Sequence, residues 1–232
     1  MQSVQEYEDT AVQEQIHAAA EEKEFVFPEK SKAYDFWKRF FDIVLCTFAL
    51  IVLSPILLVV AILIKLEDGG SVIYTATRLT KNGKEFPMYK FRSMSMGAEA
   101  QLDSLKVYNE MSGPVFKIAD DPRITKIGHF IRKTSIDELP QLINIIRGDM
   151  TIIGPRPPLP HEVAQYTPYQ MHRLDVKTGL SCYHECMGRS DDTDFDHWVE
   201  LDLKYIRERS LWTDLKIIFM TIQVVLTGKG AV

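Results

Sequence analysis

The sequence predicts an α+β protein that is mainly helical and associated with a membrane. Three observations predict this class. Residues 43–64 form an apolar run without a charge, residues 71–92 show a strand-turn-strand pattern, and helix-period segments follow from residue 97 onward. With 232 residues, of which 46% are hydrophobic and 25% charged, the chain can bury one sizeable core.

The pattern divides the chain into three parts. Residues 1–30 form an acidic extension, either a loosely held helix or disordered, in which we expect no chemistry. Residues 31–66 form an interfacial and membrane segment, and residues 67–232 form a globular domain.

The net charge of -5 argues against general nucleic-acid binding, and three cysteines without framework spacing favour a reducing compartment. The cysteine usage therefore predicts a domain on the cytoplasmic side. The acidic first thirty residues resemble no cleavable signal, so we expect another segment to target the chain.

The apolar run is long enough to cross a hydrocarbon layer of ~30 Å as a helix. A buried core helix is the alternative interpretation. Ser54-Pro55 divides the run into halves, each reaching only about 16 Å, because proline removes a backbone donor and kinks a helix. The Ser54 hydroxyl is a candidate partner for a carbonyl freed by Pro55. Lys38, Arg39 and Lys65 place positive charge at both ends, which favours a re-entrant hairpin, although a kinked crossing helix stays open.

The remaining elements follow in order. Aromatic and basic residues at 31–42 are typical of a headgroup interface. Lys81-Asn82-Gly83-Lys84 marks the turn of a small β-hairpin. We expect a polar helix at 97–110 and short helices at 126–133 and 139–146, the last begun by Asp137-Glu138. A rigid proline-rich loop at 154–158 precedes helices at 161–174, 195–209 and 211–227, the last either an interfacial amphipathic helix or a core helix.

Two clusters could carry chemistry. Asp137 and Glu138 point about 100° apart if they start a helix, so one carboxylate could act as nucleophile or base while the other holds a metal. The alternative is that the pair only caps a helix and complements its dipole. Arg156, fixed between prolines, is preorganised for bidentate contact with phosphate, or else is an ordinary surface arginine.

Further cations indicate a ligand rich in phosphate: Lys90, Arg92, Arg132 and Arg189. The cluster Cys182-Tyr183-His184-Glu185-Cys186 contains metal-binding side chains, but its spacing fits no usual zinc pattern. The sequence also lacks a Walker loop, a Gly-x-Gly-x-x-Gly motif and a Ser-His-Asp spacing. The residues alone therefore indicate a membrane-attached enzyme with a phosphate-bearing ligand.

Several ordered motifs between residues 38 and 231 resemble the bacterial sugar transferases, the monotopic phosphoglycosyl transferases. The motifs are Lys38-Arg39-x-Phe41-Asp42, Ser54-Pro55, Tyr89-Lys90-Phe91-Arg92-Ser93-Met94, Asp121-Pro122-Arg123-Ile124-Thr125, Ser135-x-Asp137-Glu138-Leu139-Pro140-Gln141, Gly148-Asp149-Met150, Gly154-Pro155-Arg156-Pro157 and Glu200-Leu201-Asp202.

The resemblance implies transfer of a sugar-1-phosphate from a UDP-sugar to a polyprenyl (undecaprenyl) phosphate, the first membrane step in assembling an exopolysaccharide or glycoconjugate. The residue matching Asp137 attacks phosphorus, UMP leaves and a covalent aspartyl intermediate forms. The residue matching Glu138 binds Mg²⁺. Arg132, Arg156, Arg189, Lys90, Arg92 and Asp202 match positions that bind phosphate or nucleotide. The resemblance also implies a re-entrant membrane helix broken at Ser54-Pro55 and a catalytic domain on the cytoplasmic face of the bacterial inner membrane.

The chain departs from the family pattern near the predicted site. Ala76 and Thr80 stand where the family often has glutamine and glycine, and residues 178–187 replace a different family sequence just before Arg189. A catalytically impaired, membrane-anchored scaffold of the same pathway is therefore an alternative. The sugar, the length of the acceptor and the oligomeric state stay open, a homodimer being among the partners that the sequence admits.

Overall fold

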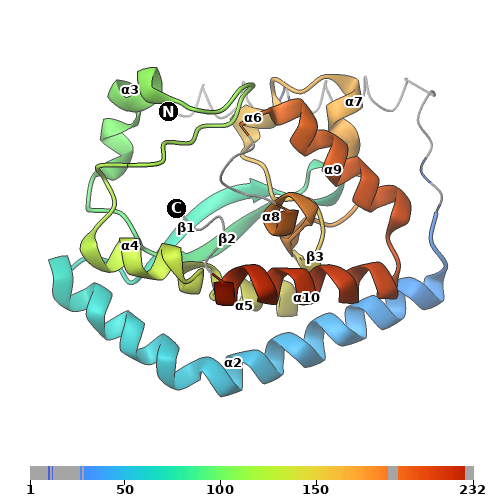
Figure 1. The fold of residues 1–232 in the computed structure, drawn as a ribbon, viewed down its shortest axis with the longest axis horizontal. Coiled ribbons are helices and arrows are strands. Elements are labelled where there is room, and N and C mark those ends of the chain that lie inside the picture. The colour runs from blue at the N-terminus through green and yellow to red at the C-terminus, as the bar shows by residue number, and fades with distance from the viewer. Residues whose placement is uncertain (1–9, 11, 13–26, 28, 188–192, 228–232) are drawn as a thin grey trace.

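The computed structural model describes residues 10, 12, 27, 29–187 and 193–227, so most of the predicted acidic extension lies outside the described residues. Among these residues helices predominate, as predicted, and two small two-stranded sheets accompany them, of which the sequence predicted one. Figure 1 shows helix α2 (Lys32–Asp68) as a wide V below the rest of the chain. Helices α4 (Lys126–Lys133), α5 (Gln141–Arg147) and α10 (Leu211–Thr227) lie in a layer directly above it and contact it.

Helix α2 continues through Pro55, so the expected break takes the form of a bend within one helix (Figure 1). Pro55 has no N–H to donate to the carbonyl of Ile51, four residues earlier. The Ser54 hydroxyl donates to that carbonyl at 2.8 Å, which confirms its predicted role. Ser31 caps the start of the helix, and Gly69 ends it in the left-handed conformation at φ 74°.

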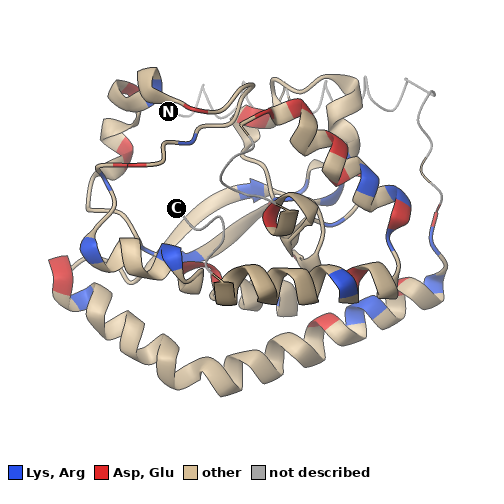
Figure 2. Ribbon diagram, viewed as in Figure 1, with Lys and Arg blue, Asp and Glu red and all other residues tan. Residues whose placement is uncertain are grey.

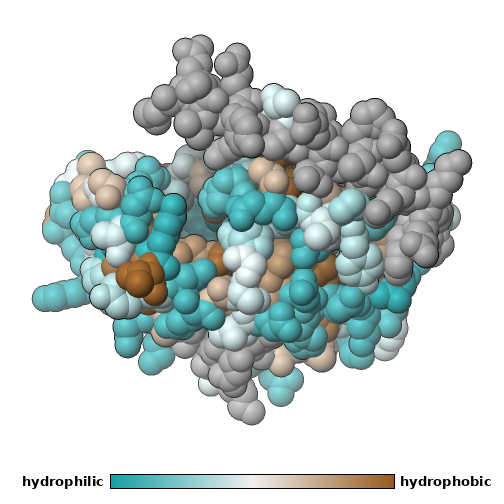
Figure 3. Space-filling model, turned by 90° about the horizontal axis from the view of Figure 1, so that it is seen from above, coloured by the Kyte–Doolittle hydropathy of each residue, from teal (hydrophilic) through white to brown (hydrophobic). Residues whose placement is uncertain are grey.

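The middle of α2 exposes its apolar side chains, so the alternative of a buried core helix is wrong. Phe48, Ile51 and Leu58 are 66%, 68% and 62% exposed. The helix is long and apolar enough to cross a membrane by length and composition. Figure 2 shows that charged residues occur only toward its two ends. On the face of the molecule opposite α2, the surface of the described residues is largely hydrophilic (Figure 3).

Polar residues in the first arm of α2 attach it to the backbone of the domain. Arg39 donates through both terminal nitrogens to the carbonyls of Ile145 and Ile146, at 2.5 and 2.6 Å. Asp42, buried, accepts from the Thr151 hydroxyl at 2.7 Å and from the Ile152 amide at 3.0 Å. Lys38 donates to the carbonyl of Ile153 at 3.0 Å and pairs with Asp214 of α10 at 2.7 Å. The Lys38-Arg39-x-Phe41-Asp42 motif is therefore an anchor rather than part of the site.

The predicted β-hairpin is confirmed by strands β1 (Ile73–Leu79) and β2 (Glu85–Phe91), which pair antiparallel from Ile73 with Phe91 to Leu79 with Glu85. Their connection contains the short turn η1 (Lys81–Gly83). Asn82 and Gly83 have φ values of 59° and 69°, the left-handed pair that an Asn-Gly hairpin turn requires.

Other elements differ from the predictions where the chain is polar or contains proline. The helix predicted at 97–110 is present over residues 98–108, but only its middle is α-helical: η2 (Ala98–Gln101) and η3 (Lys106–Tyr108) are 3-10 helices on either side of α3 (Leu102–Leu105). Residues 161–174 are divided into α6 (Pro160–Val163), α7 (Pro168–Met171) and η5 (His172–Leu174), because Thr167 caps a new helix whose first residue is Pro168. Helix α9 (Phe195–Glu208) and α10 agree with the predictions.

Three short elements had no recognisable pattern. Strands β3 (Thr151–Ile153) and β4 (Gly179–Ser181) form a parallel pair, and helix α8 (Tyr183–Met187) follows directly. The two strands approach closely: a Cβ added to Gly179 would lie 2.1 Å from the Gly154 nitrogen. This pair places the proline-rich loop after β3 beside the segment that leads into α8.

We predict that Asp42→Ala lowers the free energy of unfolding by about 2–4 kcal/mol, since it leaves a buried hydroxyl and a backbone amide without their acceptor. Thermal unfolding in detergent measures the change. Asp35→Ala, at an exposed carboxylate on the same helix, is the control and should change stability by less than about 0.5 kcal/mol. Equal effects of both substitutions would contradict the anchoring role.

Candidate active site

A cleft of about 800 Å³ opens between the β1-β2 hairpin, residues 94–123, α4, the turn η4 (Ile136–Glu138) and α8. Basic and acidic side chains both line it, and among the described residues the basic ones predominate. The basic residues are Arg78, Lys90, Arg92, Lys117, Arg123, Arg132 and Arg156. The acidic residues are Glu99, Asp121, Asp137, Glu138 and Glu185. The cleft therefore suits a polyanionic ligand beside a small number of carboxylates.

The acidic pair occupies a turn between two helices. Ser135, with φ 56°, reverses the chain after α4 in a conformation uncommon for a residue with a side chain, and such strain often accompanies functional sites. Asp137 and Glu138 follow within η4, and Pro140 then occupies the N-cap of α5. The prediction that the pair begins helix 139–146 is therefore wrong by one turn, because Pro140 lacks the donor of an inner helical residue and sets the start of α5.

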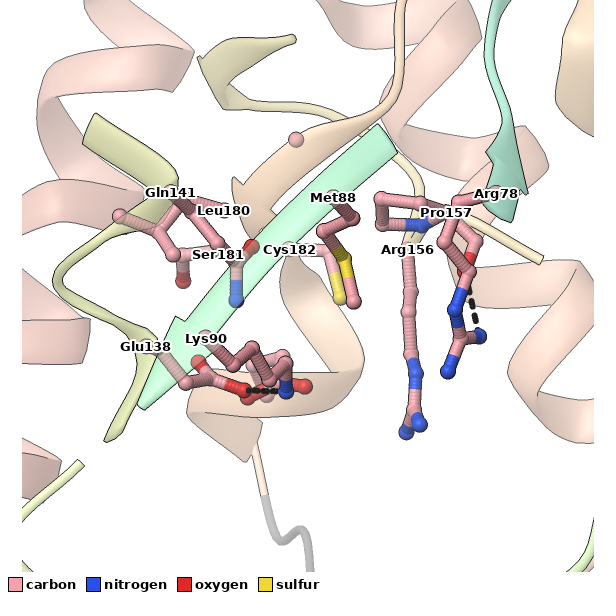
Figure 4. A pocket seen from close by; sticks show the side chains of 12 residues that line it. Arg78, Met88, Lys90, Glu138, Gln141, Arg156, Pro157, Leu180, Ser181 and Cys182 are labelled. Carbon is pink, nitrogen blue, oxygen red and sulfur yellow. Dashed lines mark hydrogen bonds and ion pairs between the residues drawn. The ribbon is translucent and has the colours of Figure 1, made fainter. Parts of the chain in front are cut away.

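A buried amide side chain holds α5 against strand β2. Asn144, fully buried, donates to the Pro87 carbonyl at 2.7 Å and accepts from the Tyr89 amide at 3.0 Å. These two bonds fix the strand next to the acidic turn. As a result Lys90, the next residue of β2, reaches Glu138 and donates to its Oε1 at 2.7 Å (Figure 4).

The two carboxylates of the pair have different surroundings. Asp137 is 8% exposed and lies near Arg132, while Glu138 is neutralised by Lys90. Burial lowers the pKa of Arg132, and the negative charge of Asp137 opposes this shift. Arg132 Nε donates to the Ser93 hydroxyl at 2.8 Å, which orients the guanidinium at the cleft wall. Two adjacent acids with distinct cationic neighbours can take distinct chemical roles.

Arg156 projects into the cleft from the loop after β3 (Figure 4). Its guanidinium carbon lies 5.2 Å from the ring centre of Trp198 on α9, a cation-π contact. Trp198 is buried, and the ring of His184 stacks on it with the centroids 4.4 Å apart. Arg156 is thus held by an aromatic surface, in addition to the rigid loop predicted from its prolines.

Arg92 connects the cleft with the far end of α2. It forms an ion pair with Asp68, the last residue of α2, whose pKa is lowered by the Gly70 amide first and by Arg92 as well. The Arg92 guanidinium packs directly against Gly70, so a Cβ added there would displace it. The other predicted cations, Lys90, Arg132 and Arg156, line the same cleft.

Asp202 does not line the cleft, in contrast to the expectation that it belongs to the ligand-binding set. It is fully buried in α9 and accepts from Arg173 at 2.8 Å. Burial raises the pKa of Asp202 to about 6, against the opposing charge of Arg173. Arg173 lies 5.3 Å from the ring centre of Trp198, so Asp202 supports the aromatic surface that holds Arg156. Arg189 lies outside the described residues.

Sequence reasoning missed several residues of the cleft. Arg123 and Asp121 form a buried bidentate pair, with Nη2 to Oδ2 at 2.6 Å and Nε to Oδ1 at 2.9 Å, and this contact lowers the pKa of Asp121. The motif Asp121-Pro122-Arg123 in the sequence could have indicated these two residues. Arg78 and Glu185 also line the cleft, and only the tertiary structure brings them there.

Comparisons with known proteins identify a family and several relatives of this chain. The model of the family described as Bacterial sugar transferase matches residues 33–228. The chain belongs to the bacterial sugar transferase family. It is 47% identical over 194 residues to galactosyl transferase CpsE of Streptococcus agalactiae serotype III, a match that covers 84% of this chain and 43% of that protein.

Two further relatives of this sugar transferase differ in length. The UDP-glucose:undecaprenyl-phosphate glucose-1-phosphate transferase of Escherichia coli is 40% identical over 204 residues, covering 84% of this chain and 41% of the relative. The exopolysaccharide production protein ExoY of Sinorhizobium fredii is 39% identical over 198 residues, covering 84% and 87%. The chain thus spans less than half the length of the CpsE and E. coli relatives and most of the length of ExoY.

We predict that Asp202→Ala lowers the free energy of unfolding by about 3–5 kcal/mol, because it leaves Arg173 as a buried charge without its partner. Chemical unfolding in detergent measures this loss. Asp196→Ala, at an exposed position of the same helix, is the control and should change stability by less than about 1 kcal/mol. Unchanged stability together with weaker binding of a phosphate-bearing ligand would instead show that Asp202 contacts that ligand directly.

Proposed function

We propose that this chain transfers a sugar-1-phosphate from a UDP-sugar to undecaprenyl phosphate or a similar polyprenyl phosphate, with release of UMP. One observation carries the proposal: a buried aspartate beside an ion-paired glutamate in a basic cleft above an exposed apolar helix. The name of the E. coli relative, which includes UDP-glucose and undecaprenyl phosphate, supports it. The reaction would be a first membrane step of polysaccharide or glycoconjugate synthesis, as the name of ExoY supports.

The proposed reaction has two displacements at one phosphorus. A carboxylate oxygen of Asp137 attacks the phosphorus that carries the sugar, and the bond to the bridging oxygen breaks with its electron pair leaving on UMP. A phosphate oxygen of the polyprenyl phosphate then attacks the same phosphorus. The bond to Asp137 breaks, the carboxylate is restored, and the lipid diphosphate sugar leaves. Each displacement exchanges one P–O bond for another, so protons and charge balance and no oxidation state changes.

The cleft residues would act by neutralising and orienting phosphates. Attack by an anion on a charged diphosphate is slow unless cations offset the charge. Arg132 and Arg156 are held by Ser93 and by the Trp198 ring, so little ordering is required when phosphate binds. Lys90 holds the Glu138 carboxylate in place through the ion pair at 2.7 Å. Arg92 and the predicted Arg189 would extend the basic surface, and homodimerisation stays a prediction.

We further propose that Mg²⁺ is held by Glu138 together with the donor phosphates. Mg²⁺ prefers oxygen ligands and is commonly bound by one or two carboxylates plus substrate phosphates. The described residues contain no group of three metal-capable side chains, and Glu138 offers a carboxylate in the cleft, which fits that mode of binding. When bound, the ion would supply positive charge for the phosphates.

The attachment of α2 supports a re-entrant, monotopic topology at the bacterial inner membrane, with the cleft on the cytoplasmic face. The first arm is anchored through Lys38, Arg39 and Asp42, and the second through Asp68, to the same domain. A straight crossing would carry one end to the far side and separate it from these partners. Exposed apolar side chains of α10, including Trp212 at 76% and Phe219 at 64%, would contact the interface beside α2.

We predict that Asp137→Asn reduces UMP release at least about 1,000-fold, since the amide is a poor nucleophile. The assay combines purified protein, Mg²⁺, undecaprenyl phosphate and a panel of UDP-sugars. Asp103→Asn, at a carboxylate that is 89% exposed on α3, is the matched control and should keep full activity. Unchanged release by Asp137→Asn would refute the proposed nucleophile. Absence of release by the parent protein with every UDP-sugar would favour the impaired scaffold.

The topology predicts equal accessibility of the two ends of α2. Lys32 and Leu66 are each replaced by a single cysteine in a variant without the native cysteines. Both cysteines should resist an impermeant maleimide that is added to spheroplasts, in which the inner membrane is intact and its outer face is accessible. Both should react in inverted vesicles, as should a cysteine at Asp103, which reports the side of the domain. Labelling of one end only from outside would show a crossing helix.

A further inference from the structure

Arg78 lies next to Arg156 in the cleft. Figure 4 shows the two side chains side by side, one from β1 and the other from the proline-rich loop, with both guanidinium groups at the same end of the small pocket that adjoins the main cleft. Both residues line the pocket and the main cleft. Two like charges are therefore concentrated at one wall.

Within the part of the chain that the structure describes, these two cations have no carboxylate in ion-pair contact. Arg156 contacts the Trp198 ring, and Arg78 Nη1 donates to the Pro157 carbonyl at 3.0 Å. Arg78 Nε is buried and has no hydrogen-bond partner. Burial lowers the pKa of Arg78 to about 10, and the charge of Arg156 adds to this shift while the charge of Glu162 opposes it. A buried donor and two adjacent positive charges indicate a place for an anion.

Backbone contacts fix the position of one arginine relative to the other. The Leu79 amide donates to the Pro158 carbonyl at 3.0 Å, and Arg78 itself donates to Pro157. Two hydrogen bonds thus attach the end of β1 to the loop that carries Arg156. Because the loop contains several prolines, the pair loses little conformational freedom when a ligand binds.

We propose that Arg78 and Arg156 together bind the diphosphate of the donor nucleotide sugar. The assignment rests on the proposed function and specifies its donor site. Two guanidinium groups can each donate two hydrogen bonds to phosphate oxygens, and neighbouring phosphates offer oxygens to both. Lys90 is committed to Glu138 and Arg123 to Asp121, whereas the Arg78 and Arg156 pair keeps its charge for the ligand.

The test measures binding separately from turnover. In the Asp137→Asn variant with Mg²⁺, isothermal titration would give Kd values for UDP, UMP and inorganic pyrophosphate. We expect Arg78→Gln to weaken UDP and pyrophosphate by at least roughly tenfold, the loss of a charge-assisted contact, and UMP by less. Arg207→Gln, at an arginine whose side chain is 50% exposed on α9, is the control. UDP and pyrophosphate affinities within twofold of the parent would overturn the proposal.

A second substitution separates binding from folding. Arg78→Lys keeps the charge but loses the planar, forked donor, so it should bind pyrophosphate more weakly than the parent while unfolding at a similar temperature. If Arg78→Gln does not fold, parent-like pyrophosphate binding by Arg78→Lys overturns the proposal. In protein with Asp137 intact, Arg78→Lys should raise KM for the UDP-sugar and leave KM for the polyprenyl phosphate unchanged. Absence of UMP release by the parent would refute the transferase reaction yet leave the pyrophosphate result interpretable.

Discussion

The hydrogen bonds from the first arm of α2 to the backbone of α5 and β3 fix both walls of the cleft. Arg39 holds the last turn of α5, whose first turn follows the acidic pair, and Asp42 holds β3, which leads to Arg156. Carbonyls at a helix end and amides at a short strand need partners when they are buried. The apolar helix supplies these partners, so the segment suited to lipid also determines the geometry of the polar site.

Charge is arranged unevenly across the cleft. Lys90 with Glu138 and Arg123 with Asp121 form neutral pairs, while Arg78 and Arg156 face the cleft beside aromatic and backbone contacts. Ion pairs keep the carboxylates oriented at low electrostatic cost, and the two arginines outside these ion pairs attract phosphate. Behind this wall, the buried pair of Arg173 and Asp202 supports Trp198 and so reaches Arg156 indirectly.

Local patterns were sufficient where one short segment decides the structure. Asn82-Gly83 alone specifies the hairpin turn, and Ser54 beside Pro55 specifies the local hydrogen bond in the bend of α2. They failed where competing signals lie close together. Thr167-Pro168 starts a new helix inside an apparently continuous one, and Pro140 moves the start of α5 beyond the acidic pair. Strands β3 and β4 were missed, since three residues are too few to show a period.

The sequence by itself determined the long apolar helix, the hairpin, the acidic pair and the motifs that place the chain in its family, because each depends on composition or on residues close along the chain. Only the tertiary structure decided that Asp202 lies behind the cleft and that Arg78 lies beside Arg156. Both depend on packing between residues 29 to 79 positions apart along the chain, as between Arg173 and Asp202 or between Leu79 and the proline-rich loop. Charge alone cannot distinguish a buried structural ion pair from a ligand-binding arginine, since burial and neighbours give each its role.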